Sequence, residues 1–258
     1  MPALLPIDSV RIHSAGSGPA LVLLHPLGVD HQMWDFAVAR LKARFTVLTY
    51  DLPGHGGTPV PAGPYRIEDL SAQLGALLAK AGVQQAHVAG MSLGGLVAQH
   101  FAASRPERVE RLVLADTTPR YVDEMRAMWV KRAAEARSAG TAVLTEGILK
   151  IWFTEAFLAQ DPPAVRFVRE CFARTPGEGY ALACEALGAA DLRALVPAIQ
   201  APTLVVCGDQ DVPNMVDSAR WFAATIRGAR LEWLAPARHA SPLEHPDAFV
   251  QLLEGFLG

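Results

Sequence analysis

Residues 88–97 read VAGMSLGGLV, and this stretch places Ser92 among three glycines between two apolar runs. The run before Ser92 is typical of a buried strand, and the run after it has the pattern of a helix. In that setting the pattern G-x-S-x-G predicts a sharp strand-to-helix turn that exposes the serine hydroxyl as a nucleophile. Gly90 and Gly94 would be small because side chains there would collide where strand and helix approach closely. The alternative is a plain glycine-rich loop, which the flanking patterns make less favourable.

Short apolar runs and helical patterns alternate on both sides of this turn. Runs typical of strands buried on both faces of a sheet lie at 20–25, 45–50, 87–90, 111–116, 202–208 and 230–235. Helical patterns lie between or after them, at 34–44, 66–82, 93–104 and 246–257. This alternation predicts an α/β fold, with a mostly parallel central sheet flanked by helices.

Residues 119–190 interrupt the alternation, because they carry helical patterns with embedded aromatic residues and no convincing strand. An insertion between two strands of a parallel sheet would lie above the carboxyl ends of the strands, where open α/β sheets bind ligands. We therefore predict a core formed by residues 1–118 and 191–258, and a helical lid formed by residues 119–190.

A serine nucleophile needs a base and an acid that orients the base, and on such a turn they follow in the order acid, then histidine. Asp209 and Asp211 follow the predicted strand at 202–208, and His239 follows the next one. We predict that Ser92, Asp211 and His239 form the catalytic group. Asp209 is the alternative acid, although it could instead brace its own loop.

Two other residues compete for these roles. His245 precedes a proline at a predicted helix start, where a capping role is the simpler interpretation. Asp116 ends another predicted strand and is a weaker candidate for the acid, since it could equally form a turn or a cap. The prediction therefore keeps Asp211 and His239.

Acyl transfer also needs two donors for the developing oxyanion. The backbone N–H of Leu93 directly follows the nucleophile and is the first candidate. The second should come from the loop HPLG at 25–28, in which Pro26 has no N–H. We predict that Leu27 supplies this N–H, and that His25 forms a hydrogen bond within the loop rather than titrating in catalysis.

Composition limits the functional classes. The chain has 258 residues, 51% of them apolar, and a net charge of −3, so it is a folded protein with no electrostatic case for binding nucleic acid or anionic membranes. We expect no signal peptide and no membrane-spanning helix. The three cysteines fit neither a disulfide framework nor a metal site, and free thiols are typical of a reducing cytoplasm.

The motifs HPLG, DLPGHG, GMSLGG, GDQD and RHASPLEHP follow one another in the order and spacing of the α/β-hydrolase superfamily, which the whole chain resembles. Within it, WFTEAF (152–157), CEALGAADLR (184–193) and ADTTPRY (115–121) resemble 3-oxoadipate enol-lactonases. This resemblance implies a cytoplasmic, cofactor-free hydrolase that opens a small carboxylated lactone. A general short-chain carboxylesterase and a non-catalytic ligand receptor of the same fold are the alternatives, and the sequence leaves the oligomeric state open.

A carboxylated substrate must find a partner for its charge in an apolar pocket, because an unpaired buried charge is costly. A helix N-terminus could serve, or one of the lid cations: Arg120, Lys131, Arg132, Arg137 and Lys150. Lys150 is the chosen candidate because it lies two residues before Trp152. Trp152 and Trp129 are predicted to line the pocket, although each could instead belong to the core of the lid.

Overall fold

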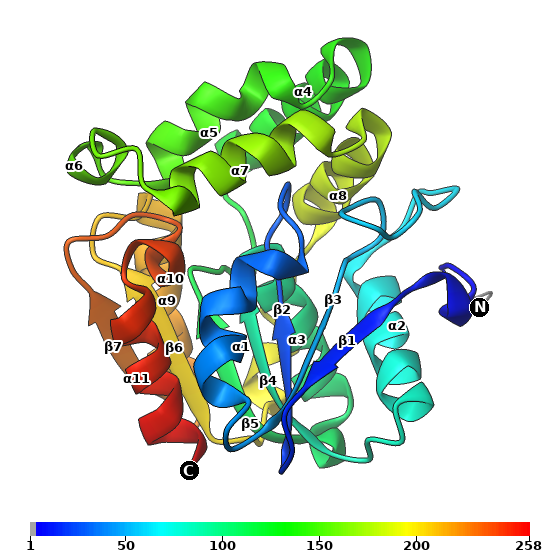
Figure 1. Ribbon diagram of the computed structural model, residues 1–258, viewed down its shortest axis with the longest axis vertical. Helices are drawn as coiled ribbons and strands as arrows, with labels where there is room; N and C mark the ends of the chain where they lie inside the picture. Colours follow the sequence, from blue (N-terminus) through cyan, green and yellow to red (C-terminus); the bar gives the residue numbers. More distant parts are fainter. Residues whose placement is uncertain (1–3) are drawn as a thin grey trace.

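The computed structural model describes residues 4–258, in which seven strands form one sheet in the order β1-β3-β2-β4-β5-β6-β7 (Figure 1). β1 pairs antiparallel with β3, and all other neighbours are parallel. The predicted α/β fold is therefore confirmed. The strands are β1 (Ile12–Ala15), β2 (Ala20–Leu24), β3 (Thr46–Tyr50), β4 (Ala86–Met91), β5 (Val109–Ala115), β6 (Thr203–Gly208) and β7 (Arg230–Leu234).

Helices cover both faces of the sheet, which is why every residue of β4 and β6 is buried. On one face α1 (Asp35–Leu41) packs against α11 (Pro246–Leu257), and on the other α2 (Ile67–Lys80) packs against α3 (Leu93–Ser104). No helix within residues 4–258 is both long enough and apolar enough to cross a membrane.

Two regular elements lack a clear sequence pattern. β1 has only four residues at the edge of the sheet, and none of them is fully buried, so it carries no apolar run. Helix α9 (Pro213–Thr225) begins directly after the loop that follows β6 and packs on β6 and β7. Five short 3₁₀ segments complete the core and the lid: Ile7–Ser9, His31–Trp34, Pro106–Arg108, Ala142–Leu144 and Val196–Ala198.

The lid segment between β5 and β6 is helical and forms the upper layer of Figure 1, above the sheet. Where the chain enters and leaves this layer, Arg120 and Asp191 form an isolated antiparallel bridge. The longest pairing within the layer is that of α4 with α8. Its helices are α4 (Asp123–Ala139), α5 (Thr145–Trp152), α6 (Glu155–Leu158), α7 (Pro163–Arg174) and α8 (Gly177–Ala189), and the short helix α10 (Ser241–Glu244) lies in the core before α11.

Candidate active site

Ser92 lies between β4 and α3 in a backbone conformation that few residues adopt, with φ 51° and ψ −111°. The two flanking glycines make this turn possible. A Cβ on Gly90 would lie 2.2 Å from the carbonyl oxygen of Gly94, and one on Gly94 would lie 2.3 Å from that of Leu24. Strain of this kind is concentrated at functional sites, and here it turns the serine out of the end of the strand.

The imidazole of His239 lies between Ser92 and Asp211. Its Nε2 is 3.1 Å from Ser92 Oγ, and its Nδ1 is 2.9 Å from Asp211 Oδ2. Asp211 belongs to the loop after β6 and His239 to the loop after β7, so the parallel sheet brings both side chains to the edge where β4 ends. Because a carboxylate can only accept, Nδ1 carries a proton and Nε2 can take one from the serine.

The competing residues have other partners. Asp209 Oδ1 accepts a hydrogen bond from Ala237 N at 3.0 Å and so braces the loop that precedes His239. His245 Nε2 is 2.8 Å from Pro236 O, and Asp116 accepts hydrogen bonds from Gly208 N at 2.9 Å and from Ser241 Oγ at 2.7 Å. The structure thus places Asp211, and not Asp209 or Asp116, in hydrogen-bond contact with His239.

The charges around His239 favour its protonated form. Burial on its own would lower the pKa of His239, but the charge of Asp211 and the hydrogen bond to it outweigh burial, and the pKa lies above 6.5. Asp116 is fully buried, and this burial together with the charge of Asp211 raises the pKa of Asp116 far above its usual range. Asp211 therefore provides the main charge that would stabilise an imidazolium here.

A cavity of about 400 Å³ opens over Ser92 and His239. Both the core and the lid line it, and most of the lining side chains are apolar or aromatic, among them Leu27, Met125, Met128, Trp129, Ile148, Ile151, Trp152, Phe172 and Met215. A cavity of this size fits a small molecule. Both predicted aromatic residues, Trp129 and Trp152, thus lie at the cavity.

The predicted substrate cation is wrong. Lys150 is exposed and does not line the cavity. Among the described residues that line it, Arg132 is the only lysine or arginine. Its guanidinium lies 5.1 Å from the ring centroid of Trp129, one turn earlier on α4. The helical spacing of Trp129 and Arg132, three residues apart, was the sequence signal that could have identified it.

Other polar groups also face this cavity. Trp129 also lines it, but its indole nitrogen is buried and has no hydrogen-bond partner among the described residues. Tyr121, Tyr180 and Asn214 also line the cavity. The sequence indicates Tyr180 as an aromatic residue shared between the pocket and the core of the lid, whereas Tyr121 and Asn214 were not selected. The ring centroid of Trp152 lies 6.2 Å from that of His239, so this side chain borders the reacting atoms.

The loop after β2 lies against the turn at Ser92, since Gly94 packs on the carbonyls of Leu24 and His25. Leu52 N donates to His25 Nε2 at 2.8 Å, and an amide can only donate, so the proton of the ring is on Nδ1. This Nδ1 is 2.7 Å from Pro26 O and donates to it. His25 thereby fixes the loop that carries the Leu27 amide, as expected, and burial lowers its pKa.

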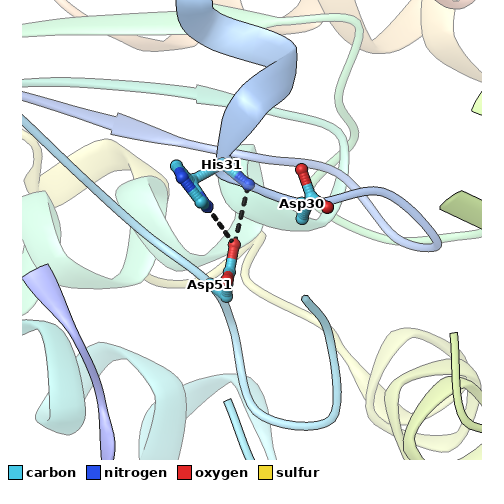
Figure 2. A group of neighbouring side chains, drawn as sticks. All are labelled: Asp30, His31 and Asp51. Carbon is cyan, nitrogen blue, oxygen red and sulfur yellow. Dashed lines mark hydrogen bonds and ion pairs between the residues drawn. The ribbon is translucent and has the colours of Figure 1, made fainter. Parts of the chain in front are cut away.

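A second polar cluster, formed by Asp30, His31 and Asp51, lies at the ends of β2 and β3 (Figure 2). Asp51 Oδ1 accepts a hydrogen bond from His31 N at 2.8 Å and lies 2.7 Å from His31 Nδ1. Asp51 Oδ2 accepts from Gly57 N at 2.8 Å, and Asp30 pairs with Arg174 of the lid. Because these oxygens already have donors within the protein, the cluster joins loops and is a poor metal site.

Comparison with known proteins assigns the family. Residues 21–252 match the model of the alpha/beta hydrolase family. The chain belongs to this family. It is 35% identical to 3-oxoadipate enol-lactonase 2 of Acinetobacter baylyi, over 93% of this chain and 88% of that protein. It is also 34% identical to a pimeloyl-[acyl-carrier protein] methyl ester esterase of Chromobacterium violaceum, over 94% and 95% of the two chains.

A solved structure supports the same family assignment. The enol-lactonase from Burkholderia xenovorans LB400 superimposes with a TM-score of 0.92 at 37% identity, covering 96% of each chain. The family is therefore shared with both lactonases and methyl ester esterases, which are hydrolases of carboxylic esters. The chain is accordingly a hydrolase of this family that acts on an ester or a lactone.

Proposed function

We propose that this protein is a serine hydrolase that opens a small carboxylated lactone, and that Ser92, His239 and Asp211 are its catalytic residues. The observation that carries the proposal is the continuous pair of contacts from Asp211 Oδ2 through the imidazole of His239 to Ser92 Oγ. A serine hydroxyl is a weak nucleophile until a base removes its proton, and the base acts best when a carboxylate fixes its tautomer.

In the proposed first step, Ser92 Oγ attacks the lactone carbonyl while His239 Nε2 takes the serine proton. The carbonyl oxygen becomes an oxyanion, for which the backbone N–H groups of Leu27 and Leu93 are the proposed donors. Leu93 is the first residue of α3, so its N–H has no partner within the helix. The ring C–O bond then breaks, which leaves an acyl-enzyme and an enolate. The enolate takes the proton from His239 Nε2 and becomes a ketone, so His239 is neutral again.

In the second step His239 removes a proton from water, which attacks the carbonyl carbon of the acyl-enzyme. The bond from that carbon to Ser92 Oγ then breaks, Oγ takes the proton back from His239, and the product leaves as a carboxylate. An enol lactone suits this site because its leaving group is a stabilised enolate and needs little help from an acid. The apolar lining suits the carbon skeleton of the acyl group, and the small volume of about 400 Å³ limits the substrate to a compact molecule.

The proposed substrate is 3-oxoadipate enol-lactone, whose free carboxylate would be bound by Arg132. Two observations support this choice: the single cation among the described residues of the cavity lining, and the names of two similar proteins. A charge-assisted hydrogen bond of this kind contributes about 1.5–3 kcal/mol. The proposed alternative is a general short-chain carboxylesterase, which would not depend on Arg132.

The test compares kcat/KM for 3-oxoadipate enol-lactone and for its methyl ester in the wild type and in Arg132→Met. We expect Arg132→Met to lower kcat/KM for the free acid by about 10- to 100-fold, the equivalent of one such hydrogen bond. For the methyl ester, kcat/KM in Arg132→Met should fall only slightly. Lys131→Met removes the neighbouring exposed cation and serves as the matched control. Equal losses for both substrates, or efficient hydrolysis only of simple esters, would favour the carboxylesterase.

A further inference from the structure

A buried carboxylate outside the catalytic group joins the lid to the loop that carries His239. Glu244 ends helix α10, five residues after His239, and only 7% of its surface is exposed. Its Oε1 accepts hydrogen bonds from the backbone N of Thr154, at 2.9 Å, and from the hydroxyl of Thr154. Its Oε2 accepts from Arg238 N at 3.0 Å. Each oxygen of one side chain therefore binds a different part of the molecule.

Two further hydrogen bonds run between the same segments. Ala240 N donates to Trp152 O at 2.9 Å, and the guanidinium of Arg238 donates to Lys150 O at 2.5 Å. The residues on either side of His239 are thus bonded to Trp152 itself and to Lys150, two residues before it. Between these bonds the rings of Trp152 and His239 lie close together, with centroids 6.2 Å apart and ring planes tilted by 60°.

We propose that Glu244 is a positioning residue that fixes His239 relative to Trp152. It thereby couples the position of the lid on the core to the position of the catalytic base. The proposal rests on the proposed function, because it takes His239 to be that base. Catalytic groups tolerate only small displacements, and a shift of about 1 Å can cost a hundredfold in rate. Glu244 is well suited to this role because hydrogen bonds to a carboxylate are stronger than those between neutral groups.

The hydrogen bonds of the two Glu244 oxygens can be removed separately. Thr154 presents two donors to Oε1, whereas Arg238 presents one donor to Oε2, so the amide of Glu244→Gln is expected to turn its oxygen toward Thr154. Its NH₂ group then faces the N–H of Arg238, and the bond on the His239 side is lost. Thr154→Val removes the hydroxyl bond on the lid side and leaves the Arg238 bond in place. Thr154→Ser keeps the hydroxyl and should behave as the wild type.

The measurements are kcat and KM for a small activated aryl ester and for the lactone, at temperatures well below each variant's melting temperature. We expect Glu244→Gln to lower kcat by about tenfold for both substrates, because the base is displaced for any acyl group. Thr154→Val should instead raise KM for the lactone, which fills the cavity beneath Trp152, and change kcat little. Glu254→Gln, which removes a partly exposed carboxylate paired with Arg40 and distant in sequence from the lid, is the matched control.

The outcomes separate this inference from the function on which it rests. If the wild type hydrolyses neither ester nor lactone, the proposed function fails. If the wild type is active but Glu244→Gln changes only the melting temperature, the carboxylate is structural and the coupling does not exist. A shift of kcat in Glu244→Gln and of KM in Thr154→Val, with Thr154→Ser unchanged, supports the coupling.

Discussion

The core and the lid border the same cavity, but they contribute groups of opposite character. The core contributes Ser92, Asp211 and His239, which are joined by hydrogen bonds at the carboxyl ends of β4, β6 and β7. The lid contributes mostly apolar side chains and a single cation, Arg132. Under the proposed function, the sheet edge determines the chemistry and the side chains of the lid select the substrate. Substitutions in the two regions should therefore affect different kinetic constants.

Substitutions in the core should have the largest effects. We expect Ser92→Ala and Asp211→Asn each to lower kcat by roughly 10⁴-fold or more with little change in KM, because the nucleophile or the correct tautomer of the base is lost. Asp209→Asn is the matched control, since it replaces a carboxylate two residues away that bonds only to the Ala237 amide. Its Oδ1 can still accept, so kcat should fall by less than tenfold.

The measurement is steady-state turnover of an activated ester, together with a melting curve for each variant. Near-normal turnover in Ser92→Ala would exclude a serine mechanism. If Asp209→Asn proved as damaging as Asp211→Asn, the orientation of the loop, and not a direct contact with His239, would explain the role of the acid.

The arrangement of the serine, the acid and the histidine in the core could be predicted from the sequence for a physical reason. The turn at Ser92 requires glycines on both sides, because a Cβ at either position would collide with backbone. The acid and the base follow strands that the fold places side by side. Such constraints act on the backbone, and they leave a pattern that is local in the sequence. Only the choice between Asp209 and Asp211 needed coordinates, because both follow the same strand.

The residues of the lid that line the cavity could be predicted only in part, because each helix has one face toward the cavity and one away from it. Lys150 and Trp152 are two residues apart on α5, which corresponds to about 200° around a helix. Since Trp152 points toward the cavity, Lys150 points away from it and is exposed. Trp129 and Arg132 are three residues apart on α4 and lie on one face. The spacing of residues along a helix shows which of them share a face, but whether that face meets the cavity depends on how the helix packs on the core.

Substitutions at the aromatic lining of the lid should have smaller effects on rate than those in the core. We expect Trp152→Ala to raise KM for the lactone by about tenfold, and to destabilise the fold by about 3–5 kcal/mol because the indole is buried. Trp152→Phe keeps much of this volume and should keep most of the affinity. A loss of stability with an unchanged KM would assign Trp152 to the core of the lid and not to the cavity.

The smallest expected effect concerns pH. It tests whether the charge of Asp211 sets the pKa of His239. The pKa of His239 is raised above 6.5, mainly because the charge and hydrogen bond of Asp211 outweigh burial. The base must be neutral to accept the serine proton, so kcat/KM for an uncharged ester should rise with pH through a midpoint above 6.5. The same shift stabilises the fold below the unfolded-state pKa of histidine, and this contribution is lost as pH rises through the folded-state pKa. In Asp211→Asn the midpoint of the residual activity should move to lower pH, because burial then acts alone with the weaker influence of Asp116. An unchanged midpoint in Asp211→Asn would mean that a group other than His239 controls the acid limb of the profile.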